Sequence, residues 1–164
     1  MSVRGMFRPG MRAYFIPLAA GVALATSAFL PWVVVGGVSL RGVPGVAALW
    51  VLGLGALSAV LATLSLITRK NSRHPLLVVG LAALGLTYLS LQIMPRLAGE
   101  SALTVSQAFA IVENRPLDSA PTSFAGIGLY VGLAASAVLV AFGLTIVIKR
   151  ASQPYVNSDP NDDV

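Results

Sequence analysis

Four long apolar runs dominate the chain, and none of them contains Asp, Glu, Lys, Arg or His. They cover residues 13–35, 46–68, 75–94 and 124–148. Each meets the length of about 20 residues that a helix needs to cross a hydrocarbon core about 30 Å thick. The runs are continuous and lack the alternation typical of membrane β-strands. The pattern predicts an all-α integral membrane protein with four transmembrane helices in an up-down bundle.

Composition supports this prediction. Hydrophobic residues make up 56% of the 164 residues and charged residues only 10%, whereas soluble domains carry about 25% charged residues. The mean hydropathy is +0.83. An ordinary soluble domain is therefore excluded, and the lipid bilayer is the first partner that we expect.

The first run has a second interpretation. Arg4, Arg8 and Arg12 precede it and the small residues 26–28 lie within it, as in a secretory signal peptide with a cleavage site. The run continues to Val35, which is longer than the usual 7 to 15 residue core of a signal peptide. An uncleaved anchor is the favoured interpretation, and cleavage stays open as the alternative.

The connections carry loop signals. Residues 36–45 are rich in Gly and include Pro44, which predicts a hairpin, and residues 69–74 form a short basic turn. Residues 95–123 form the longest loop. Residues 1–12 are predicted to be a basic cytoplasmic N-terminus, and the polar residues 149–164 a disordered cytoplasmic tail.

The long loop contains one further predicted element. Residues 104–107 fit a capping box, and Val105, Phe109 and Val112 recur at helical spacing before Asn114 and a following proline stop the run. We expect a short interfacial helix in the outer loop between the third and fourth spans, lying on the membrane surface.

Basic residues predict the orientation, because cytoplasmic loops retain Lys and Arg. With the N-terminus inside, eight basic residues lie inside and three outside. The inner set is Arg4, Arg8, Arg12, Arg69, Lys70, Arg73, Lys149 and Arg150, and the outer set is Arg41, Arg96 and Arg115. We expect a multi-pass protein of the bacterial inner membrane with both termini cytoplasmic. The dispersed basic residues argue against nucleic-acid binding.

The composition also limits the chemistry. The chain has no Cys and one His, so thiolate metal sites, disulfides and bis-histidine haem within one chain are excluded. No span carries an ionisable group, which is the usual mark of a proton relay or ion pathway. Transporters of the small multidrug resistance family need a glutamate in the first span, and this chain has none there. We predict no enzyme activity, catalytic residue, cofactor or metal.

Small residues at helical spacing are the main feature of the spans, and such stripes let helix backbones approach closely in lipid. The favoured interpretation is packing within one four-helix bundle, and the alternative is docking of the Gly128 face onto another subunit. The stripes are Gly128, Gly132 and Ser136 in the fourth run, Gly55, Ala59 and Thr63 in the second, and Ala19, Ala23 and Ser27 in the first.

The polar side chains in the spans are few. The serine and threonine hydroxyls, including those of Ser58, Ser65 and Thr87, are expected to donate hydrogen bonds to helix carbonyls or to neighbouring helices. Tyr88 and Gln92 are the most polar pair of the third run. They are candidates for a small polar pocket, although an interhelical hydrogen bond is the favoured interpretation.

These patterns favour a structural role. We expect an accessory or assembly subunit of a larger membrane complex, for example a respiratory or photosynthetic one, which contacts other membrane protein subunits or further copies of itself. The alternative is an oligomeric transporter or channel for an uncharged or apolar solute, lined by hydroxyl groups, Tyr88 and Gln92.

Overall fold

The computed structural model describes residues 13–68, 73–114 and 121–151. The predicted N-terminal segment 1–12 and most of the predicted tail lie outside these residues. The elements, in chain order, are α2 (Phe15–Ser27), β1 (Pro31–Val35), β2 (Val38–Arg41), α3 (Val46–Thr68), α4 (Arg73–Glu113), β3 (Ser123–Ala125) and α5 (Ile127–Ala151).

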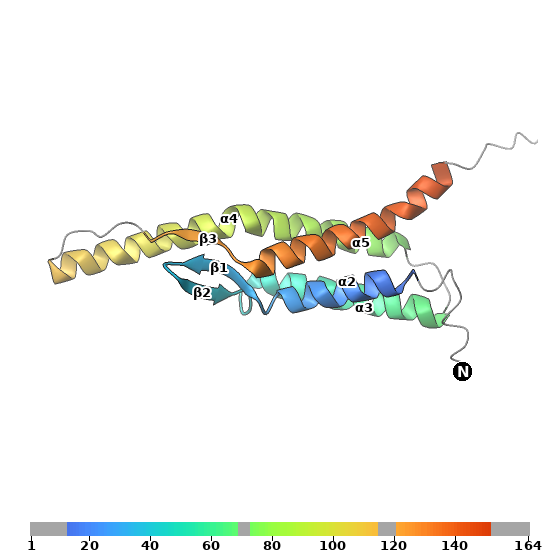
Figure 1. Ribbon diagram of the computed structural model, residues 1–164, viewed down its shortest axis with the longest axis horizontal. Coiled ribbons are helices and arrows are strands. Elements are labelled where there is room, and N and C mark those ends of the chain that lie inside the picture. Colours follow the sequence, from blue (N-terminus) through green and yellow to red (C-terminus); the bar gives the residue numbers. More distant parts are fainter. Residues whose placement is uncertain (1–12, 69–72, 115–120, 152–164) are drawn as a thin grey trace, which may run out of the picture.

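The four helices run alternately up and down and pack side by side (Figure 1). α2 contacts both α3 and α5, and α4 packs along α5 and contacts α3. Three helices of the described chain, α3, α4 and α5, are long and apolar enough to cross a membrane, whereas α2 has only 13 residues. The predicted fold is therefore confirmed in its coarse features, a mostly helical chain with three apolar helices long enough to cross a membrane.

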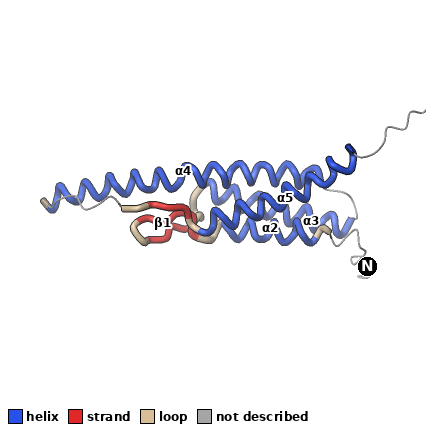
Figure 2. The backbone as a smooth tube through the Cα atoms, turned by 45° about the horizontal axis from the view of Figure 1, so that its top comes forward, coloured by secondary structure: helices blue, strands red, loops and turns tan. Residues whose placement is uncertain are grey.

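The prediction of an all-α fold is wrong, because a small antiparallel sheet lies at one end of the bundle (Figure 2). Its strand order is β2-β1-β3, with Val35 opposite Val38 in one pair and Val34 opposite Phe124 in the other. We call this end of the molecule the sheet end. Gly36 and Gly37 join β1 to β2 with φ of 54° and 84°. Two successive positive φ angles match the right-handed twist of paired strands and favour glycine.

The predicted first span, 13–35, is also wrong in its second half. α2 ends at Ser27, and its last turn is followed by a tight turn and β1. Pro31 has no backbone N–H and is unfavourable inside a helix, and the three valines 33–35 are β-branched residues that favour strands. The run 13–35 is apolar throughout, so hydropathy alone did not indicate where the helix ends and the strand begins.

The predicted loop 95–123 with its separate interfacial helix is corrected as well. α4 is one helix of 41 residues that continues through Pro95 to Glu113, a length of about 62 Å. Thr104 lies inside this helix, where its Oγ1 donates to the carbonyl oxygen of Glu100 rather than capping an N-terminus. The helix ends where the sequence predicted, and Asn114 follows with a left-handed φ of 51°.

The core follows the contact seams between the helices. Leu24 from α2, Val51 from α3, Leu76 from α4 and Leu139 from α5 are fully buried. At the end opposite the sheet, the rings of Tyr14 and Phe142 stack edge to face at 5.4 Å. Most large apolar side chains on the outer helix faces are exposed, as expected for a bundle whose solvent is lipid.

Candidate functional site

The predicted stripe on α5 faces residues of the same chain. A Cβ on Gly128 would lie 2.7 Å from Cδ1 of Trp32, and one on Gly132 would lie 3.1 Å from Oγ of Ser27. Ser136 is fully buried, and its Oγ donates to the carbonyl oxygen of Leu133 at 2.9 Å. This face of α5 is therefore occupied by α2, β1 and α4.

The predicted stripe on α3 meets a glycine that the sequence analysis did not single out. A Cβ on Gly55 would lie 2.5 Å from the backbone nitrogen of Ala25, and a Cβ on Gly21 would lie 2.8 Å from that of Ala59. Thr63 is exposed, and its Oγ1 donates to the carbonyl oxygen of Ala59. The spacing of Gly21 and Ala25 was the signal that could have identified this contact.

The buried hydroxyls divide into two groups. Thr87 and Ser136 donate to carbonyls of their own helices, as predicted. Ser58 and Ser65 on α3 are fully buried, and neither Oγ has a hydrogen-bond partner. The prediction of backbone hydrogen bonds is wrong for these two serines.

Tyr88 and Gln92 lie one turn apart on the outer surface of α4. Tyr88 is 52% exposed and Gln92 is also exposed. Neither side chain lines the two grooves described below. A polar pocket at this pair stays a prediction.

Exposed aromatic side chains mark the sheet end of the bundle. Trp50 in the first turn of α3 is 64% exposed, and Tyr130 in the first turn of α5 is 57% exposed. Phe29, which follows α2, is also exposed. Aromatic rings with this exposure are typical of the headgroup level in membrane proteins.

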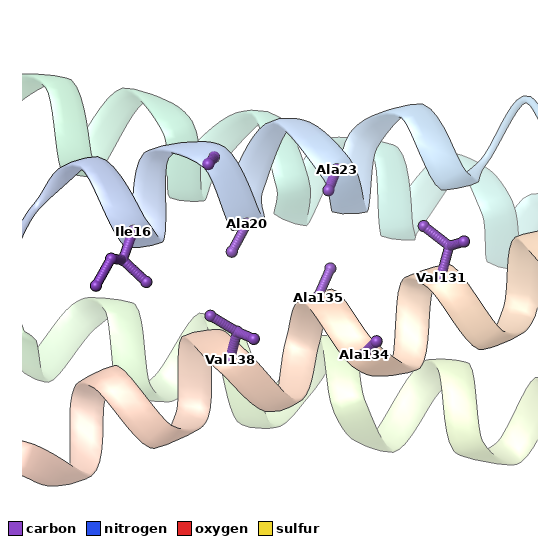
Figure 3. A pocket seen from close by; sticks show the side chains of 8 residues that line it. Ile16, Ala20, Ala23, Val131, Ala134, Ala135 and Val138 are labelled. Atoms are coloured by element: carbon purple, nitrogen blue, oxygen red, sulfur yellow. The ribbon is translucent and has the colours of Figure 1, made fainter.

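An apolar groove of about 530 Å³ lies between α2 and α5 (Figure 3). Side chains from both helices point into it, including Ile16 and Ala20 from α2 and Ala135 and Val138 from α5. Its lining residues are all aliphatic, so it offers no group for acid–base chemistry. Among the described residues there is also no cluster of three or more His, Cys, Asp or Glu side chains that could hold a metal ion.

A second groove, of about 320 Å³, lies at the sheet end between the sheet and α4. Leu40 from β2 and Leu97 from α4 lie on its two sides, and Trp32 and Gly42 line it as well. Arg41 is the one charged residue in this lining. The groove brings together residues that lie more than 50 positions apart in the sequence, which sequence reasoning missed.

The second half of α4 extends past the other helices (Figure 1). We call residues 96–113 the arm. Arg96, Glu100 and Glu113 make it too polar for the hydrocarbon core, yet Phe109 is 62% exposed and Val112 is 81% exposed. The arm thus presents apolar side chains outside the apolar part of the bundle.

β3 fastens the base of the arm to the sheet. The Oγ of Ser123 donates to the carbonyl oxygen of Pro95 at 2.8 Å. A Cβ on Gly99 would lie 2.6 Å from the same Oγ, so only glycine fits at this crossing without a shift. The base of the arm is therefore in contact with β3.

Comparison of the chain with protein-family models, with curated proteins and with solved structures finds no match.

Proposed function

We propose that this protein is an accessory or assembly subunit of a larger membrane complex, and that the arm is its main contact with a partner subunit. The apolar surface on the arm carries this proposal. Val105, Phe109 and Val112 recur at intervals of four and three residues, so they share one helix face, and all three are more than half exposed. Exposed apolar patches outside lipid mark protein interaction sites.

The length of α4 supports this assignment. A hydrocarbon core of about 30 Å is crossed by about 20 residues, and the uncharged residues 75–94 supply them. The arm then projects about 27 Å into the aqueous region. A helix that served only to cross the membrane would end near Pro95.

The proposed placement in the membrane follows the charge distribution. The chain crosses the bacterial inner membrane four times, with α2 and the residues around it as the first crossing and both termini in the cytoplasm. The sheet end and the arm then face the outside, where a partner with a matching apolar surface meets them.

A photoreactive phenylalanine analogue at position 109 tests the proposal in native membranes. We expect a specific adduct with one membrane protein, and we expect none when the analogue replaces Gln107, which is exposed on another face of the arm. The double variant F109S/V112S should also lose the stoichiometric partner during purification in mild detergent. Purification of the parent protein alone as a monodisperse monomer, with no adduct from position 109, would contradict the proposal.

A further inference from the structure

Two glycines, Gly42 and Gly45, line the groove at the sheet end. A Cβ on Gly42 would lie 2.6 Å from the indole Nε1 of Trp32, and one on Gly45 would lie 2.7 Å from the carbonyl oxygen of Gly42. The backbone of Gly42 therefore packs directly against the Trp32 indole in the loop of residues 42–45. The space left between this loop and α4 is the groove of about 320 Å³.

The walls of the groove are apolar and incompletely covered. Leu40 on β2 is 50% exposed, and Leu97 on α4 is 56% exposed, although each lines the groove. Met94 and Ala98 continue the wall along α4. An occupant with a flexible apolar chain would remove both leucines from water.

One cation lies at this apolar surface. Arg41 is the last residue of β2 and is exposed. Within the part of the chain that the structure describes, its guanidinium has no hydrogen-bond or ion-pair partner. A guanidinium has five N–H donors in a fork that matches phosphate oxygens. The groove thus combines an apolar wall with one donor group for an anion.

The depth of the groove in the membrane selects the occupant. Met94 ends the uncharged run of α4, and Trp50 and Tyr130 mark the headgroup level at the same end of the bundle. Phosphates and the first methylenes of acyl chains lie at this level in a bilayer. A protein ligand would have to enter between headgroups, whereas a lipid is already present.

We propose that this groove binds an anionic phospholipid, with the phosphate against Arg41 and one acyl chain running along Leu97 and Met94 toward the hydrocarbon core. The site would hold one lipid at a fixed place beside the sheet. This lipid site depends on the proposed placement in the membrane but not on the partner contact of the arm. Phe109 and Val112 take no part in it, and the arm contributes only Leu97 and Ala98 at its base.

Tryptophan fluorescence tests the proposal, because Trp32 lines the groove and the chain has only one other tryptophan. The variant W50F leaves Trp32 as the sole emitter. The purified full chain is reconstituted into phosphatidylcholine vesicles, and brominated phosphatidylglycerol or brominated phosphatidylcholine is added as quencher. We expect half-maximal quenching at a mole fraction about threefold lower for the glycerol lipid, the effect of one exposed ion pair.

Two matched variants in the W50F background separate charge from shape. R41Q should remove the preference for the anionic lipid, whereas R96Q should keep it, since Arg96 does not line the groove. A98F should fill the groove and weaken quenching by both lipids. Equal quenching curves for both lipids in W50F, or equal losses in R41Q and R96Q, would overturn the proposal. Absence of quenching by either lipid would also overturn it, and would leave a second copy of the chain as the occupant.

Discussion

α2 and α4 use their apolar runs in opposite ways. α2 uses 13 residues of a 23-residue apolar run, and the rest of the run becomes a turn and β1. α4 uses all of its 20-residue run and then continues for a further 19 residues beyond Met94. In these two segments the length of the apolar run therefore does not determine where the helix ends.

The two helices also differ in the tertiary contacts that fix their positions. α2 is fixed by tertiary contacts, through the backbone approach of Gly21 to α3 and through Trp32, whose Nε1 donates to the carbonyl oxygen of Ser27 at 2.9 Å. The arm of α4 is mostly a single exposed helix, fastened at its base by Ser123. Substitutions near α2 should therefore cost stability, whereas substitutions on the arm should leave it almost unchanged.

Trp32→Ala should cause the largest loss in the free energy of unfolding. Trp32 is 1% exposed, and its ring fills the space beside Gly42 and Gly128. Truncation of a buried aromatic side chain costs about 4 kcal/mol, and the loss of its hydrogen bond leaves the Ser27 carbonyl without that donor. The free energy of unfolding in mixed micelles measures the loss. Trp50→Ala is the control, because Trp50 is 64% exposed. Similar losses for both variants would show that α2 does not depend on this anchor.

Gly55→Leu should cause the next largest loss in the free energy of unfolding. Its side chain would begin 2.5 Å from the backbone nitrogen of Ala25, so α2 and α3 would have to separate. Overpacking of this kind costs about 3 kcal/mol. Gly53→Leu is the matched control on the same helix, because nothing lies within 4 Å of a Cβ there. The control should be neutral or slightly stabilising, since Leu has the higher helix propensity. An equal loss in both variants would contradict the close approach of the two helices.

The bounds of an element were predicted best where an apolar run is flanked directly by glycine or a charged residue. The bounds of α3, Val46–Thr68, match the predicted run, because Gly45 precedes it and Arg69 follows it. Around α2 no polar residue separates the helix from β1, and apolarity alone does not distinguish a buried strand from a buried helix. Pro31, the valines 33–35 and the glycine pair at 36 and 37 were the local signals for a hairpin.

The grooves and the arm depend on contacts that no local pattern specifies. Leu40 and Leu97 come to opposite sides of one groove because β1 and β3 of the sheet pack beside α4. The spacing of Val105, Phe109 and Val112 did predict a helix with an apolar face. The sequence analysis did not predict that this helix continues the third apolar run, because a proline such as Pro95 is typical of a helix end. A proline there removes one backbone hydrogen bond, and the helix continues on both sides of it.

Ser123→Ala should have a modest and local effect. The variant removes the hydrogen bond from Ser123 Oγ to the carbonyl oxygen of Pro95, which costs about 1 kcal/mol. Hydrogen exchange should speed up at amides of the arm and stay unchanged in α5. Ser101→Ala is the control, because Ser101 Oγ donates to the carbonyl of Leu97 within the arm itself. If both variants left exchange in the arm unaltered, the fastening at Pro95 would have no role in ordering it.

Phe109→Ser should have the smallest effect on the isolated protein. Phe109 is 62% exposed and Phe and Ser have similar helix propensities, so the free energy of unfolding should change by less than about 0.5 kcal/mol. The same variant should nevertheless weaken co-purification of a partner, because an exposed aromatic side chain contributes little to the fold and much to an interface. Gln107→Ser, on another face of the arm, should change neither quantity. A stability loss as large as that of Gly55→Leu would mean that the arm packs on its own chain, and the contrast between α2 and α4 would then fail.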